Sequence, residues 1–145
     1  MEIYSIGFTK KTAEQFFSLL KSAGIRRLLD VRLNNISQLA GFAKRDDLRF
    51  FLREICGAEY IHEPLLAPTQ EILDEYKKNK GSWHEYEGKF QALMAERKIE
   101  EKLDQSAFAA PTVLLCSEVK PEQCHRRLVI EYLAAKWEPF EVRHL

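Results

Sequence analysis

The chain has 145 residues, of which 46% are hydrophobic and 30% are charged, as in an ordinary globular protein. Its 22 basic and 22 acidic residues cancel, so no overall field draws the chain toward nucleic acid or a membrane surface. No apolar run reaches the roughly 20 residues that span a bilayer. Three cysteines without a framework spacing, and a strand-like start at Met1 in place of a signal peptide, favour a cytoplasmic protein over the secreted and membrane classes.

In chain order, the first half alternates strand-like runs with helical patterns. The predicted elements are a strand over 2–7, a helix from a capping box at Thr12 and Gln15 to Gly24, a strand over 26–32, a helix with Leu48, Phe51, Leu52 and Ile55 on one face that closes at Gly57, and a strand over 58–64. Each helical pattern therefore separates two strands, as in a parallel sheet.

The second half continues the alternation. Residues 69–104 are predicted to form two helices that break at Gly81, and the apolar run over 111–117 predicts a strand buried on both faces. Pro121 suits the first position of a helix, and residues 140–145 form the last strand. The sequence therefore predicts one α/β domain over residues 1–145, an open, mostly parallel sheet of about five strands with helices on both faces.

Polar side chains follow several of the predicted strands. Ligands of open parallel sheets bind beyond the carboxyl ends of the strands, near the point where strand order reverses. The residues at those ends are Gly7 and Thr9, Asp30 and Arg32, His62 and Glu63, and Cys116 and Glu118. Their convergence at one edge is the main functional signal in the sequence.

Several motifs resemble the DUF488 family of uncharacterised bacterial and archaeal proteins. They are "YSIGFTKKTAEQFFSLL", "LLDVRLNNISQLAGFAKRDDL", "EYIHEPLL", "LLCSEVKPEQCHRRLVIEYL" and the closing "VRHL". The chain departs from the family pattern at "LLAP", where "LGG" is common, and in "RLNNIS", which keeps Arg32 and Ser37 but lacks a proline. The resemblance implies an α/β fold and a shared site, and it implies no reaction.

Cys116 and Glu118 lie at the end of the fourth strand, before a turn into a helix. One interpretation makes Cys116 a nucleophile whose thiolate is favoured by the helix amides and by Arg126, and the other makes it a buried structural cysteine. Glu118 is interpreted either as a general acid or base beside the arginines or as a cap of the turn.

Cys124 and His125 open the last helix. His125 shares a stripe with apolar residues, so a hydrogen-bonded core histidine and a catalytic histidine are both interpretations of it. We assign no metal ligands, because the spacing of eight residues between Cys116 and Cys124 is not a zinc-pair spacing; zinc bound by the two cysteines and His125 is an alternative, and the sequence leaves the cofactor unknown. A redox-active disulfide between Cys116 and Cys124 is a second minority alternative.

Asp30 and Arg32 alternate along one strand and face the same side, where an ion pair between them is expected. An arginine at a strand end also clamps phosphate or carboxylate, and the "IGFTKKT" turn and Arg126 lie in the same predicted region. The stretch "KKNKGSWHEYEGKF" offers aromatic rings beside lysines, a pattern that packs helices more often than it stacks on bases.

We therefore expect an anion-binding, catalytic pocket for a small phosphate-bearing ligand, such as a nucleotide or a nucleic-acid end, with no membrane partner. The catalytic candidates are Asp30, Cys116, Glu118 and His125, and the ligand-binding candidates are Gly7, Thr9, Arg32, Ser37, Cys124 and Arg126. The alternatives are a sensing or nucleic-acid-binding module without turnover and a polar cluster that only stiffens the fold. The sequence leaves the reaction and the oligomeric state open.

Overall fold

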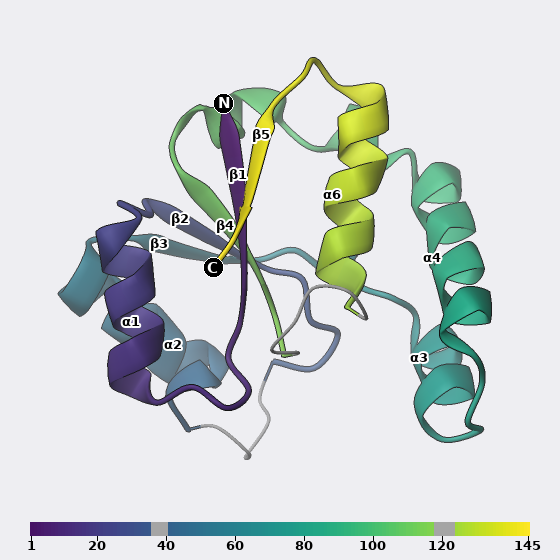
Figure 1. The fold of residues 1–145 in the computed structure, drawn as a ribbon, viewed down its shortest axis with the longest axis horizontal. Helices are drawn as coiled ribbons and strands as arrows, with labels where there is room; N and C mark the ends of the chain where they lie inside the picture. Colours follow the sequence, from purple (N-terminus) through teal and green to yellow (C-terminus); the bar gives the residue numbers. More distant parts are fainter. Residues whose placement is uncertain (36–40, 118–123) are drawn as a thin grey trace.

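The computed structural model describes residues 1–35, 41–117 and 124–145. Its sheet has five strands in the order β3-β2-β4-β1-β5, and each neighbouring pair runs parallel. The strands are β1 (Glu2–Gly7), β2 (Arg27–Asp30), β3 (Glu59–His62), β4 (Thr112–Cys116) and β5 (Glu141–His144). The predicted α/β class is confirmed (Figure 1).

Helices flank the sheet on both sides. The α-helices are α1 (Ala13–Ser22), α2 (Arg45–Phe51), α3 (Gln70–Lys77), α4 (Trp83–Arg97), α5 (Ile99–Lys102) and α6 (His125–Lys136). The capping box of Thr12 and Gln15 is present, Gly24 and Gly57 follow their helices with φ of 70° and 62°, and Gly81 separates α3 from α4. The predicted helix start at Pro121 lies outside the described residues.

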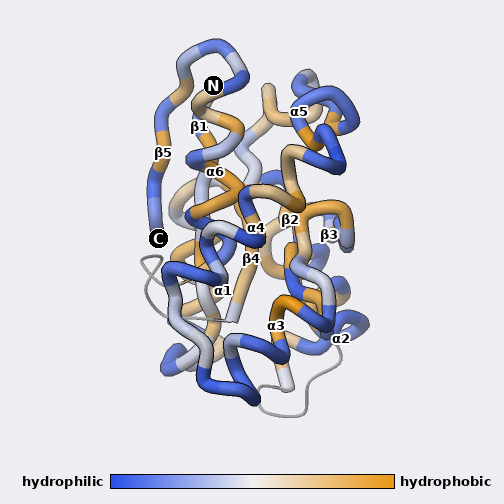
Figure 2. Tube along the Cα trace, turned by 90° about the vertical axis from the view of Figure 1, so that its right-hand side faces the viewer, coloured by the Kyte–Doolittle hydropathy of each residue, from blue (hydrophilic) through white to orange (hydrophobic). Residues whose placement is uncertain are grey.

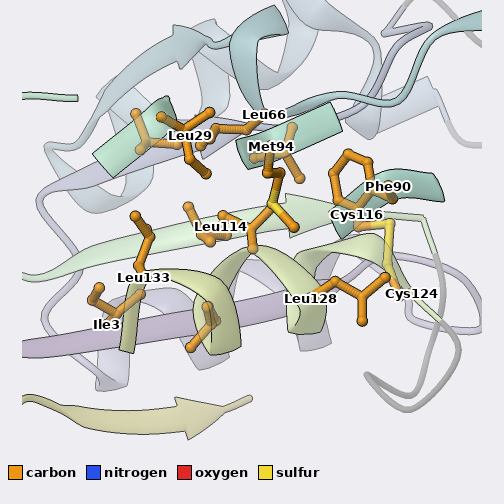
Figure 3. Packing of buried hydrophobic residues seen from close by; sticks show 14 of the residues in the cluster. Ile3, Leu29, Leu66, Phe90, Met94, Leu114, Cys116, Cys124, Leu128 and Leu133 are labelled. Carbon is orange, nitrogen blue, oxygen red and sulfur yellow. A yellow bond between two sulfur atoms is a disulfide. The ribbon is translucent and has the colours of Figure 1, made fainter. Parts of the chain in front are cut away.

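Alternate residues of the central strands feed two apolar cores. Leu114 and Cys116 of β4 face α4 and α6, where they join Phe90, Met94 and Leu128 (Figure 3). The intervening Val113 and Leu115 face α1 and α2 in the other core. All five residues of β4 are buried, as its apolar run predicts, whereas the edge strand β5 is exposed and largely hydrophilic (Figure 2).

The helix at α2 differs from its predicted face. Leu48 and Leu52 are buried in the core on the α1 and α2 side of the sheet, but Ile55 is 40% exposed. A π-helical turn over Leu52–Cys56 continues α2, and its wider turn rotates later residues away from the spacing of an α-helix. The prediction that Ile55 shares the buried face is therefore wrong.

The register brings the carboxyl ends of the strands to one edge. Gly7 of β1 pairs with Cys116 of β4, and Asp30 of β2 lies between Leu115 of β4 and His62 of β3. The polar residues that follow these strands are therefore neighbours in space, although they are far apart in sequence. Over the described parts of the chain, no helix is both long enough and apolar enough to span a bilayer.

Candidate functional site

A cavity of about 740 Å³ lies at this edge of the sheet. One side is built by residues at or just after the ends of β1, β2 and β4, among them Thr9, Arg32 and Cys116. The opposite side comes from α3 and α4, which contribute Tyr76 and Trp83. The cavity thus joins the predicted strand-end groups to an aromatic surface that the strands themselves do not supply.

Arg32 presents a guanidinium group that is bound on two sides. Its Nε and Nη2 donate to the two carboxylate oxygens of Asp30, each at 2.8 Å, and Nη2 also donates to the carbonyl of Ala43 at 2.7 Å. The ring of Phe8 lies 5.3 Å from the guanidinium carbon. The expected ion pair between Asp30 and Arg32 is present, and it fixes the direction of the guanidinium.

The remaining nitrogen of Arg32 has no such partner. Arg32 is only 5% exposed and lines the cavity, yet its buried Nη1 has no hydrogen-bond partner among the described residues. A buried donor without a partner costs free energy. An acceptor oxygen of a ligand in the cavity would satisfy it, and the Asp30 pairing holds the donor in place for that contact.

Asp30 supports the cavity without lining it. Its carboxylate is completely buried and also accepts a 2.6 Å hydrogen bond from the hydroxyl of Tyr60, which in turn accepts one from Asn35. Burial and the Asp30 contact raise the pKa of Tyr60 far above its usual value, so Tyr60 stays a donor. Asp30 lies on the α1 and α2 side of the sheet and Cys116 on the α4 and α6 side. The two catalytic candidates therefore do not share a face.

The turn after β1 brings lysines to the cavity. Lys10 and Lys11 line the cavity, and Lys10 has a left-handed backbone with φ of 62°. Burial, and after it the charge of Arg126, lowers the pKa of Lys11. Three backbone amides of the turn are engaged elsewhere: Thr9 donates to Ser117, Lys11 to Phe8, and Thr12 to the side chain of its capping partner. Anion binding at this turn would therefore rely on the lysine side chains.

Three aromatic rings, the aromatic wall, line the same cavity as these cations. Trp83 stacks on Tyr86 with ring centroids 4.9 Å apart, and Tyr76 contacts both rings at 5.6 and 5.1 Å. All three line the cavity. Burial raises the pKa of Tyr86, which keeps its hydroxyl protonated. The sequence predicted that this stretch packs helices; Tyr86 and Phe90 are buried and do so, but Trp83 also remains half-exposed at the cavity.

Cys116, Cys124 and His125 gather at the cavity wall. The two sulfur atoms are joined in a disulfide, the alternative that the sequence ranked lower (Figure 3). His125 Nδ1 lies 3.6 Å from the sulfur of Cys116, and its Nε2 lies 2.6 Å from the carbonyl oxygen of Val31. His125 also meets the edge of the Phe90 ring at 5.5 Å. A disulfide sulfur is not a nucleophilic thiolate, so the nucleophile interpretation requires the reduced form.

The other ligand candidates are placed differently. Thr9 lines the cavity, while Gly7 lies within the sheet beside Cys116. Arg126 is completely buried, is not among the residues lining the cavity, and donates from Nε to the hydroxyl of Ser5 at 3.2 Å. Ser37 and Glu118 lie outside the described residues.

The "LLAP" segment owes its position to an interaction that the sequence did not predict. Arg97 of α4 donates from Nη1 to the carbonyls of Leu65 and Ala67 at 2.8 and 2.7 Å, and burial lowers its pKa. Pro68 follows at the wall of the cavity. Arg97 thus fixes part of the cavity rim.

The contributions of Tyr60, Tyr76, Lys11 and Arg97 were missed because each depends on tertiary contacts. A tyrosine two residues before His62 could have been paired with Asp30 from the strand order, had that order been known. The other three lie on elements whose packing has no local sequence signal.

Comparison with known proteins places the chain in a family. The family described as "Domain of unknown function DUF488" matches residues 12–133, so the chain belongs to the DUF488 family. The search found no curated protein and no solved structure that matches it. The match includes every described candidate residue that the sequence predicted except Gly7 and Thr9, and the cavity-lining Lys10 and Lys11 also precede it.

Proposed function

We propose that the protein binds a phosphate-bearing ligand with a planar group, a nucleotide or a nucleic-acid end, in the strand-end cavity. The observation that carries the proposal is the buried Nη1 of Arg32, which has no hydrogen-bond partner among the described residues, in a cavity that Lys10 and Lys11 also line. Guanidinium and ammonium groups are the usual partners of phosphate oxygens. The ligand's anionic end is therefore assigned to this side.

The aromatic wall is assigned to the planar end of the ligand. Trp83, Tyr76 and Tyr86 offer a ring surface in the same cavity as the cations. Stacking of a base on an aromatic side chain contributes about 1–3 kcal/mol. A volume of about 740 Å³ also lies within the usual range for small-molecule sites, roughly 300–1,000 Å³. An inorganic anion alone would leave the aromatic wall unused.

A thiol reaction on the bound ligand is a second candidate, favoured by the contact between Cys116 and His125. After reduction, a thiol 3.6 Å from Nδ1 of an imidazole could pass its proton to that nitrogen. The hydrogen bond from His125 to the carbonyl of Val31 holds the ring in that orientation. Asp30 does not take part in this step, because it is buried behind Arg32 and lies on the other side of the sheet.

The binding proposal is tested by thermal unfolding with phosphate, pyrophosphate, a nucleoside and its nucleotides. We expect the nucleotides to raise the melting temperature more than phosphate or the nucleoside does. Phosphate or a nucleoside alone would fill only one end of the cavity, whereas a nucleotide would fill both. Affinity for the nucleotide should fall about 10- to 100-fold in Lys11→Ala, the loss of one charged contact worth roughly 1.5–3 kcal/mol.

The matched control is Lys102→Ala, which removes an exposed lysine on α5 outside the cavity lining. Its affinity should equal that of the wild type. If no nucleotide raises the melting temperature of the wild type, the binding proposal is wrong. If Lys11→Ala and Trp83→Ala both bind nucleotides as tightly as the wild type does, the ligand lies elsewhere.

A further inference from the structure

We propose that, in the reduced protein, Cys116, Cys124 and His125 bind a thiophilic divalent metal ion of the zinc class. The three ligand atoms lie within 4.8 Å of one another, and all three residues are buried. The sequence spacing did not lead us to assign a metal site; the folded positions supply what the spacing lacked. This inference is independent of the proposed ligand.

The distances suit a tetrahedral ion. With Zn–S bonds of about 2.3 Å and Zn–N bonds of about 2.0 Å, sulfur and nitrogen ligands of one zinc ion lie roughly 3.5 Å apart. The sulfur of Cys116 and Nδ1 of His125 are 3.6 Å apart. Two sulfur ligands would lie roughly 3.8 Å apart, so reduction must let the sulfurs separate. The Cα atoms of the cysteines, 7.1 Å apart, leave room for that movement.

The histidine is oriented as a metal ligand. A carbonyl oxygen only accepts hydrogen bonds, so the 2.6 Å contact with Val31 requires the hydrogen on Nε2 of His125. In the neutral ring, Nδ1 then carries a lone pair, and this is the nitrogen that faces Cys116. Histidine ligands of metals commonly donate their other ring N–H to a backbone carbonyl, which fixes the tautomer and the ring orientation.

Among the described residues, Cys116, Cys124 and His125 supply three ligands, and a tetrahedral ion has a fourth position. Cys116, Cys124 and His125 all line the cavity, while their exposed fractions are only 3%, 2% and 8%. Because the three residues line the cavity, water or an anion in the cavity can take that fourth position. Three protein ligands and one open position are the pattern of catalytic zinc sites, whereas structural sites use four.

Binding starts from the disulfide and requires a two-electron reduction. A phosphine reductant cleaves the sulfur–sulfur bond, takes an oxygen atom from water to become a phosphine oxide, and leaves two thiols. The metal ion then replaces the two thiol protons, which are released to solvent. Metal binding and the disulfide are mutually exclusive, because each cysteine binds the ion as a thiolate and a disulfide contains no thiolate.

The test is a titration of the full chain with Co²⁺ after reduction by a phosphine and removal of oxygen. We expect one equivalent of Co²⁺ to give a thiolate-to-cobalt charge-transfer band, and Zn²⁺ to displace it. Cys124→Ser should lose the band, and His125→Asn should weaken binding more than 10- to 100-fold, the range found for outer-shell changes alone. Cys56→Ser, which removes the remaining cysteine, should bind as the wild type does.

A second readout uses the wild type alone, in case a variant fails to fold. Saturating Zn²⁺ should protect Cys116 and Cys124 of the reduced chain from iodoacetamide, counted by mass spectrometry. Labelling of Cys116 that Zn²⁺ does not slow would overturn the metal site and favour a free nucleophile. Absence of the cobalt band in the reduced wild type would also overturn it. Neither outcome bears on nucleotide binding, which is measured separately in the oxidised chain.

Discussion

Arg32→Ala should destabilise the fold strongly, because it leaves the carboxylate of Asp30 buried without its cation. The substitution removes both 2.8 Å bonds to Asp30 and the 2.7 Å bond to the carbonyl of Ala43. The side chains of the pair are 6% and 0% exposed, so each charge has the other, and not bulk water, as its partner in the native fold. Breaking a buried ion pair on one side costs about 3–5 kcal/mol.

Differential scanning calorimetry or circular dichroism measures this effect. At roughly 2–4 °C per kcal/mol for a chain near this size, Arg32→Ala should lower the melting temperature by about 6–20 °C. The matched control is Arg45→Ala, whose partner Asp46 is 77% exposed, and it should change the free energy of unfolding by at most about 1 kcal/mol.

A double substitution tests the cause of the loss. Combining Arg32→Ala with Asp30→Ala removes the uncompensated carboxylate, so the double variant should lose less stability than the sum of the two single variants. If Arg32→Ala is no less stable than Arg45→Ala, the pair does not hold the fold as the contacts indicate. If the two effects simply add, Asp30 and Arg32 are not coupled.

Three other predictions concern single groups. Burial and Arg126 lower the pKa of Lys11, so Lys11 should lose its charge at a lower pH than an ordinary lysine, and the affinity for a phosphate-bearing ligand should fall there as pH rises. Lys11→Arg keeps its charge and should remove that fall in affinity. A pH profile of affinity that is the same in the wild type and in Lys11→Arg would contradict the prediction. Thr12→Ala should cost about 0.5–2 kcal/mol in urea unfolding through loss of the cap of α1, whereas the exposed Ser18→Ala should change little. Burial raises the pKa of Cys56, so iodoacetamide should label it slowly at neutral pH and faster at alkaline pH; rapid neutral labelling would refute this.

The sheet could be predicted because its signals are local. The capping box of Thr12, the apolar run of β4 and the glycine after each early helix are read from neighbouring residues. Parallel strands then place their carboxyl ends together, which predicted the edge where the cavity lies. Ile55 was misplaced because a π-helical turn has no such local signal.

The candidate site was predicted only in part. Arg32, Cys116, Cys124 and His125 were expected at one site and do line one cavity. The aromatic wall could not be predicted, because its position depends on how α3 and α4 pack across from the strand ends. Asp30 and Cys116 lie on opposite faces of the sheet. That arrangement depends on the register between β2 and β4, which the sequence does not specify.

The central claim is that the cations and the aromatic wall hold two ends of one ligand. The most direct measurement is tryptophan fluorescence in a Trp137→Phe background, where Trp83 is the remaining tryptophan. We predict that a nucleotide changes this signal in a saturable way, and that Lys11→Ala shifts the midpoint about 10- to 100-fold higher. A Trp83 signal that nucleotides leave unchanged, or a midpoint unaffected by Lys11→Ala, would contradict the claim.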